Sequence, residues 1–271
     1  MLKTEMRNPN TTHIDKMSTG EMMAAIQQEN LHAAQAVGSE LEAIARAVDA
    51  IASRMQRGGR LFYVGCGTSG RLGVMDAAEC PPTYGVSPDL VVGVIAGGDS
   101  SLRRASEGAE DQKADGIAAL QAYDIKEADS VIGISVAGGA AYVLGALEHA
   151  KEKGALTVSL SSNPGCPMEQ LADLAICPDT GAEVITGSTR MKAGSAHKMV
   201  LNMISTGVMV RLGHVYENLM INLKPTNTKL RARVIRIVRQ ITGLEEKDAL
   251  RLLDENGWVI RDALQSWEQE D

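Results

Sequence analysis

The sequence predicts an α/β fold built on a mainly parallel sheet. Its short apolar runs are continuous rather than alternating, and stretches with helical periodicity separate them. Strands that are buried on both faces of a parallel sheet have this pattern. Clusters of glycine and serine follow the apolar runs, at the sheet edge where open α/β folds bind ligands. Because 44% of the 271 residues are hydrophobic and 23% are charged, the chain has the composition of an ordered globular protein.

The N-terminal part is predicted to be an arm followed by helices. The first 18 or so residues are polar and rich in turn formers, which favours an extended arm. Ser18 and Glu21 have the spacing of a capping box, so a helix should start there. Apolar residues at helical spacing then predict helices over about 20–35 and 38–57.

The central part contains the predicted sheet. A helix should open at about Arg71 and end before Pro81, because a residue that precedes proline disfavours the helical conformation. Helical stretches of about 10–15 residues separate the strands. The predicted strands cover residues 61–64, 90–96, 130–136, 156–160 and 174–177.

The C-terminal part is predicted to be helical from about residue 188. The expected helices cover residues 192–212, 226–241, 245–255 and 258–267. A boundary is expected near 224–227, where a Lys-Pro-Thr-Asn sequence interrupts the pattern. The chain is thereby divided into an N-terminal arm with helices, a central α/β domain and a small C-terminal helical appendage, at 1–57, 58–224 and 225–271.

Composition excludes several classes of function. A formal net charge of −7 and only 3% aromatic residues argue against a nucleic-acid partner. No apolar run reaches 18 residues and no secretory signal is visible, so no membrane partner is expected. The four cysteines lack CxxC spacing, which favours reduced thiols and a cytoplasmic location. The five histidines lack metal-ligand spacing, and the chain has no GxSxG elbow, so neither a metal site nor a serine triad is predicted.

A glycine-rich turn between a strand and a helix is the sharpest local motif. Residues 65–71 read Gly-Cys-Gly-Thr-Ser-Gly-Arg. Backbone amides in such a turn can converge on an anion, and hydroxyls and a cation strengthen the binding. The motif lacks the Lys-Ser/Thr of a phosphate-binding NTPase loop and the acidic residue of a dinucleotide fold. The candidate binding residues are Gly67, Thr68, Ser69, Gly70 and Arg71, and an ordinary tight turn is the alternative.

Two acidic segments are candidates for acid–base chemistry. Glu79 precedes the Pro81-Pro82 pair, and Glu110 lies in the acidic run 107–111. A carboxyl group held near an anion can serve as a general acid or base. Solvated acidic surfaces are the alternative for both segments.

A third candidate segment combines hydroxyls with cations at a helix start. Ser188, Arg190 and Lys192 lie there, and cations of this kind can neutralise a phosphate or carboxylate. Glu183, slightly upstream, is a candidate ligand for sugar hydroxyls. A plain basic helix face is the alternative reading.

Taken together, these segments resemble the N-acetylmuramic acid 6-phosphate etherases. The likeness extends over about residues 4–240, including Thr4-Glu5 and Arg7-Asn8 in the arm. The glucokinase regulatory proteins are more distant relatives with the same fold. The motifs that carry the resemblance are residues 67–73, 78–85, 95–98, 107–111, 162–165 and 181–194.

The resemblance implies a sugar isomerase (SIS) fold, which is a flavodoxin-like αβα sandwich, and a homodimer. It implies a lyase that removes D-lactate from carbon 3 of N-acetylmuramic acid 6-phosphate in cell-wall sugar recycling. The reaction is an elimination followed by water addition, and it needs two carboxyl groups but no cofactor. By resemblance, Glu79 is the acid for lactate departure, Glu110 is its partner and Ser69 holds the 6-phosphate.

The chain departs from the family pattern after the third strand. The family has a Ser-Gly-Arg-Thr-type loop there, whereas this chain has Ala-Gly-Gly-Ala at 137–140. Gly138 and Gly139 keep the amides, and Ser135, Ser161 or Ser162 is a candidate replacement hydroxyl. Each lost hydrogen bond to a charged group costs ~1.5–3 kcal/mol, so two losses correspond to about 100-fold weaker phosphate binding. A non-catalytic sugar-phosphate sensor and an aldose–ketose isomerase therefore remain open alternatives.

Overall fold

The core of the protein is a parallel sheet of five strands in the order β2-β1-β3-β4-β5. The computed structural model describes residues 1–222, 225 and 228–270. All four strand pairings in this sheet are parallel, as the sequence predicts. The strands are β1 (Leu61–Gly65), β2 (Val91–Ile95), β3 (Ser130–Ile134), β4 (Leu156–Leu160) and β5 (Leu174–Ile176).

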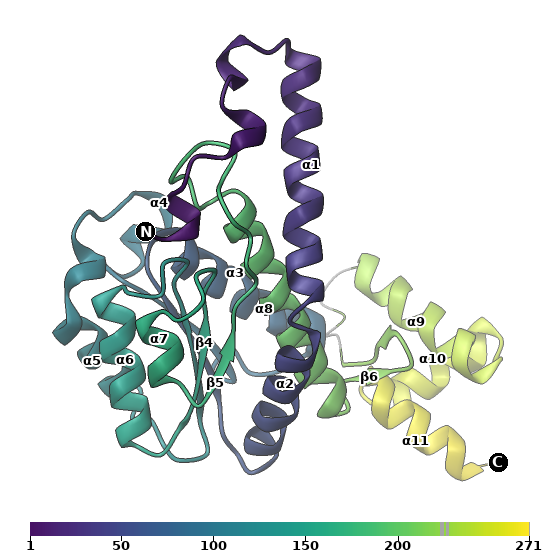
Figure 1. Cartoon of the computed structure of the whole chain (residues 1–271). Coiled ribbons are helices and arrows are strands. Elements are labelled where there is room, and N and C mark those ends of the chain that lie inside the picture. Colours follow the sequence, from purple (N-terminus) through teal and green to yellow (C-terminus); the bar gives the residue numbers. More distant parts are fainter. Residues whose placement is uncertain (223–224, 226–227, 271) are drawn as a thin grey trace.

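Helices cover both faces of the sheet (Figure 1). On one face, α2 (Leu41–Gln56), α3 (Gly67–Tyr84) and α8 (Lys192–Arg211) enclose an apolar core that includes Tyr63 and Ile132. On the other face, α5 (Lys113–Gln121) and α6 (Ala141–Glu152) enclose a second core that includes Phe62 and Val131. Successive residues of a strand point to opposite faces, which explains how neighbours along one strand contribute to two cores. The result is the predicted αβα sandwich.

Two predicted helix boundaries are wrong. Helix α3 begins at Gly67 rather than at Arg71, because the glycine-rich segment is itself the first turn of the helix. It also continues through Pro81 and Pro82 to Tyr84. Both prolines lie in the last turn, where an irregular end is tolerated, and the amide of Gly85 closes the helix by donating to the Pro81 carbonyl at 2.9 Å.

The helices between the strands are shorter than predicted in two places. The β2–β3 connection contains only α4 (Ser100–Arg103), a 3-10 turn at Ala109–Asp111 and α5, and the β4–β5 connection contains only α7 (Pro167–Leu171). Glycine-rich and turn-rich sequence occupies the remaining length of both connections. This irregular backbone carries the acidic run 107–111.

The N-terminal arm is not extended, contrary to the prediction. It forms three 3-10 turns at Lys3–Glu5, Pro9–Thr11 and Ile14–Lys16 before the capping box at Ser18 starts α1 (Thr19–Gly38). Figure 1 shows α1 rising well beyond the sheet, with the arm folded back beside it. The arm is attached by long-range hydrogen bonds, among them the one from the Thr11 hydroxyl to the Val184 carbonyl at 2.8 Å.

The C-terminal helices have an apolar core of their own. Helices α9 (Thr228–Thr242), α10 (Glu246–Glu255) and α11 (Ile260–Glu270) enclose it, and Figure 1 shows them to one side of the sheet. A short hairpin, β6 (Val215–Tyr216) and β7 (Leu219–Met220), precedes them and was not predicted. The predicted boundary near 224–227 falls, apart from Pro225, outside the described residues. No helix in the described part of the chain is both long and apolar enough to cross a membrane.

Candidate functional site

The turn from β1 into α3 depends on glycines that touch each other. A Cβ on Gly70 would lie 2.6 Å from the Gly65 carbonyl oxygen, and one on Gly65 would lie 2.7 Å from the Gly70 amide nitrogen. Gly67, the first residue of α3, has a φ of +53°, in the region that favours glycine. This contact lets the chain pass from strand to helix without a loop. The first amides of α3, which have no partner inside the helix, therefore lie at the carboxyl edge of the sheet.

A cavity of about 220 Å³ opens at this edge. Five predicted site residues line it, namely Gly67, Thr68, Ser69, Glu110 and Ser135. The remaining lining residues are Cys66, Ile134, Val136, Ala137, Ala140, Thr189 and Gly194. We call it the glycine-loop cavity. It joins the start of α3, the end of β3, the acidic run and the start of α8.

The glycine-loop cavity offers hydrogen-bond donors at one side. The Ser69 side chain is buried and makes no hydrogen bond to any other described residue, so its hydroxyl is available to a ligand. Thr68 provides a second hydroxyl, and the first-turn amides of α3 add the positive end of the helix dipole. This arrangement is suited to an anion such as a phosphate.

Glu110 supplies the carboxyl group of the cavity. Burial raises the pKa of the Cys66 thiol to about 12, with the negative charges of Glu110 and Asp111 as further causes. The thiol is therefore protonated at neutral pH and is not an activated nucleophile. Its response to Glu110 also indicates that the carboxylate lies close to the glycine-rich turn.

Arg71 supports this region from an adjoining cavity. That cavity measures about 270 Å³ and shares Cys66, Gly67 and Glu110 with the first. The guanidinium of Arg71 donates to the Leu102 carbonyl at 3.0 Å and to that of Arg104 at 3.4 Å. Arg71 thus fixes the segment that leads toward Glu110, whereas Gly70 lies packed against β1 and lines neither cavity.

Glu79 lies away from the glycine-loop cavity of its own chain. It is exposed on α3, twelve residues after Gly67. At 1.5 Å per helical residue this corresponds to about 18 Å along the axis. Because α3 continues past Pro81, no turn brings the Glu79 carboxyl back toward the sheet edge. One chain therefore does not bring Glu79 and Glu110 together.

Glu183 and Lys192 also lie elsewhere. The buried Glu183 carboxylate accepts the amides of Lys192 at 2.9 Å and Ala193 at 3.0 Å, so it caps the start of α8. Burial is the main cause of its raised pKa. The Lys192 ammonium forms a buried ion pair with Glu29 of α1. Neither side chain lines the glycine-loop cavity.

The remaining predicted residues lie near the cavity without lining it. The Gly138 amide donates to the Ser135 carbonyl at 3.0 Å and to its hydroxyl at 3.2 Å, so this amide already has partners. Gly139, Ser188 and Arg190 are absent from the lining, and Arg190 is exposed. Sequence reasoning missed Thr189, which lies beside Ser188 in the same run of hydroxyls and does line the cavity.

Among the described residues, no group of three or more His, Cys, Asp or Glu side chains is placed to hold a metal ion.

Two family models match the sheet-forming part of the chain. Residues 43–151 match the glucokinase regulatory protein N-terminal SIS domain, and residues 110–212 match the SIS domain. Among solved structures, a phosphoheptose isomerase from Neisseria gonorrhoeae is 18% identical, with a TM-score of 0.53 over 70% of this chain and 98% of that one. A phosphoheptose isomerase from Francisella tularensis has the same TM-score at 16% identity, over 71% of this chain and 98% of that one. These likenesses establish the SIS fold.

Curated relatives extend over nearly the whole chain. A protein of Caldanaerobacter subterraneus subsp. tengcongensis is 52% identical over 97% of this chain and 86% of its own length. A protein of Symbiobacterium thermophilum is 51% identical over 97% of this chain and 87% of its own length. Both are named N-acetylmuramic acid 6-phosphate etherase.

Proposed function

The chain belongs to the N-acetylmuramic acid 6-phosphate etherase family, and we propose that it cleaves the D-lactyl ether of that sugar phosphate. The products are N-acetylglucosamine 6-phosphate and D-lactate. The single observation that carries this proposal is the glycine-loop cavity, in which phosphate-type donors and the Glu110 carboxyl face one space. The protein is accordingly a carbon–oxygen lyase of amino-sugar metabolism, in cell-wall sugar recycling. The four cysteines are free thiols, which supports a cytoplasmic location.

The phosphate of the substrate is assigned to the start of α3. The first-turn amides and the hydroxyls of Thr68 and Ser69 lie together there. A dianionic phosphate gains both from hydrogen bonding and from the helix dipole at such a site. Ser135 and Thr189 provide further hydroxyls on the cavity wall, where the family loop would supply its own. These hydroxyls compensate in part for the hydrogen-bond donors that the Ala-Gly-Gly-Ala sequence at 137–140 lacks.

The chemistry then needs a base and an acid. With the sugar ring open, a base removes the proton at carbon 2, next to the aldehyde, and an acid protonates the departing lactate oxygen. Water adds at carbon 3 in the second half of the reaction. Glu110 is assigned the base role because it shares the cavity with the phosphate donors. Glu79 is assigned the acid role from the family resemblance.

The position of Glu79 makes a homodimer part of the proposal. Its carboxyl lies about three helical turns from the glycine-loop cavity of its own chain. A complete site therefore takes Glu110 from one chain and Glu79 of the partner subunit. The exposed apolar side chains of Met75 on α3 and of Met203 and Val210 on α8 support a contact between copies that involves these two helices.

The decisive experiment measures lactate release from N-acetylmuramic acid 6-phosphate by the purified protein. The wild type should release lactate, and Glu79→Gln and Glu110→Gln should each lose about 10²–10⁴-fold in rate. Glu107→Gln, a carboxyl in the same acidic run, is the matched control and should retain most of the rate. Absence of release from folded protein that still binds the sugar phosphate would reject the lyase. That result would favour a non-catalytic sugar-phosphate sensor, which the changed loop at 137–140 supports.

Mixing the two inactive variants tests the composite site. If each site uses one carboxyl from each chain, heterodimers regain one intact site, and random mixing restores about a quarter of wild-type activity. If both carboxyls come from one chain, mixing restores nothing. The second result would reject the shared site without rejecting the lyase.

A further inference from the structure

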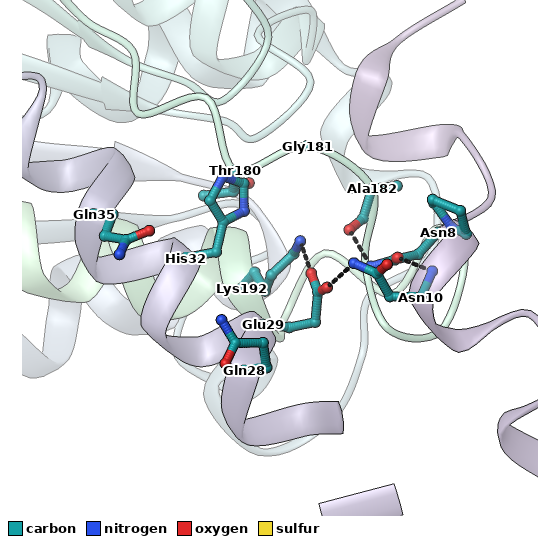
Figure 2. A pocket seen from close by; sticks show the side chains of 11 residues that line it. Asn8, Asn10, Gln28, Glu29, His32, Gln35, Thr180, Gly181, Ala182 and Lys192 are labelled. Carbon is teal, nitrogen blue, oxygen red and sulfur yellow. Dashed lines mark hydrogen bonds and ion pairs between the residues drawn. The ribbon is translucent and has the colours of Figure 1, made fainter. Parts of the chain in front are cut away.

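A second polar cavity lies between the N-terminal arm, α1 and the start of α8. It has a volume of about 370 Å³, toward the lower end of the range for ligand pockets. Figure 2 shows how side chains from these separate segments meet there. We call it the arm pocket. It shares no lining residue with the glycine-loop cavity, and the etherase reaction described above does not use it.

A buried ion pair forms one side of the arm pocket. Lys192 is 2% exposed and Glu29 is 5% exposed. One Glu29 oxygen pairs with the Lys192 ammonium, and the other accepts from the Asn10 amide at 3.0 Å. Both carboxylate oxygens thus have partners. The ammonium has three N–H donors, and Glu29 is its one hydrogen-bond partner among the described residues. Donors therefore remain free at the pocket wall.

Other polar groups around the pocket have no partner. The Thr180 side chain is fully buried, and its hydroxyl makes no hydrogen bond within the described part of the chain. Buried hydroxyls are normally paired, because an unpaired one costs about 1–3 kcal/mol. The side chains of His32 and Gln35 face the same space from α1 and make no hydrogen bonds to other described residues. A bound molecule would satisfy these groups.

The charge of the pocket selects among ligands. The charges of Lys192 and Glu29 cancel, and the remaining free groups are the Thr180 hydroxyl, the side-chain amides of Gln28 and Gln35 and the His32 imidazole. An anion would meet no uncompensated cation here, so the cost of removing it from water would not be offset. Hydroxyl and amide groups of a neutral ligand, by contrast, can both donate to and accept from these side chains. We propose that the arm pocket binds an uncharged sugar, a pyranose without a phosphate.

The two cavities must be separated by the test, because both meet the first turn of α8. Lys192 lines the arm pocket, whereas Thr189 and Gly194 line the glycine-loop cavity. Thr180→Val keeps the side-chain shape and removes the hydroxyl, so it alters only the arm pocket. Ser69→Ala alters only the glycine-loop cavity. His32→Ala, on the exposed face of α1, is a second arm-pocket variant that leaves the buried core untouched.

The experiment is a titration of the full chain with N-acetylglucosamine, followed by saturation-transfer NMR. Wild type should bind saturably in the millimolar range, and Thr180→Val and His32→Ala should each raise Kd about tenfold, the loss of one hydrogen bond. Ser69→Ala should leave Kd unchanged. Absence of saturable binding to wild type overturns the proposal. Binding that Ser69→Ala abolishes, or that neither arm-pocket variant weakens, overturns it as well, because the sugar would then occupy another site.

Discussion

The glycine-loop cavity and the arm pocket are built in opposite ways. The first is built around a main-chain turn, with Gly65 and Gly70 in contact and the amides of α3 at the sheet edge. The second is made of charged and amide side chains from segments more than 150 residues apart, as in the pair of Glu29 with Lys192. We therefore expect an added side-chain atom to disturb the glycine-loop cavity more than the loss of a charge does. For the arm pocket we expect the loss of a charge to have the larger effect.

The largest expected effect is on the ion pair of the arm pocket. Lys192→Met removes the cation and leaves the buried Glu29 carboxylate with only the neutral amides of Asn10 and Asn8 as partners. Breaking a buried pair in this way costs about 3–5 kcal/mol. Urea denaturation should show that loss in the free energy of unfolding. The double variant Lys192→Met with Glu29→Gln should recover most of it, because no uncompensated charge remains. Equal stability of the single and double variants would show that the unpaired Glu29 charge is not the cause of the loss.

The next largest effect is expected at His197. The protein keeps this buried side chain neutral, whereas the arm pocket holds a buried charged pair. Burial lowers the pKa of His197 to about 4, and its Nε2 lies 3.1 Å from the Ser162 hydroxyl. In the unfolded chain the imidazole has its ordinary pKa of about 6.5. Between pH 6.5 and 4 the unfolded chain therefore binds more protons than the folded chain does. Stability should therefore fall as pH decreases through that window, by about 3 kcal/mol in total.

His197→Gln should remove this pH dependence. Denaturation at pH 7 and at pH 4.5 measures it, and the difference between the two pH values should shrink in the variant relative to wild type. An unchanged difference would show that other groups cause the pH dependence.

A smaller effect is expected at the glycine contact. Gly70→Ala adds a Cβ that would lie 2.6 Å from the Gly65 carbonyl oxygen, so the backbone must shift. Overpacking of this kind costs about 1–3 kcal/mol. Gly20→Ala is the matched control, because nothing lies within 4 Å of its added Cβ and alanine favours a helix. Thermal unfolding should show a lower Tm for Gly70→Ala and an equal or higher Tm for Gly20→Ala. Equal Tm changes in the two variants would show that the close contact with Gly65 does not exclude a Cβ at position 70.

The same contrast explains what the sequence could predict. The strands and the glycine-rich turn follow from local patterns, since apolar runs and closely spaced glycines encode them within a few residues. The predicted start and end of α3 were wrong, because the glycines are themselves helical and because two prolines are tolerated in a last turn. Glu183 was predicted to bind sugar hydroxyls and Lys192 to neutralise an anion, whereas their partners are α8 amides and Glu29. No local pattern identifies a partner 163 residues away.

Two hydroxyl-rich segments, at the starts of α3 and α8, each offer a serine to the phosphate. Ser69 lines the glycine-loop cavity, whereas Ser188 does not, although the sequence offers both. Ser69→Ala should weaken binding of N-acetylglucosamine 6-phosphate about tenfold, the loss of one hydrogen bond to a charged group. Ser188→Ala should leave Kd within about twofold. Calorimetry of both variants measures this. A tenfold loss at Ser188 with none at Ser69 would move the phosphate to the start of α8, where Arg190 is the adjacent cation, and would overturn the assignment to main-chain amides.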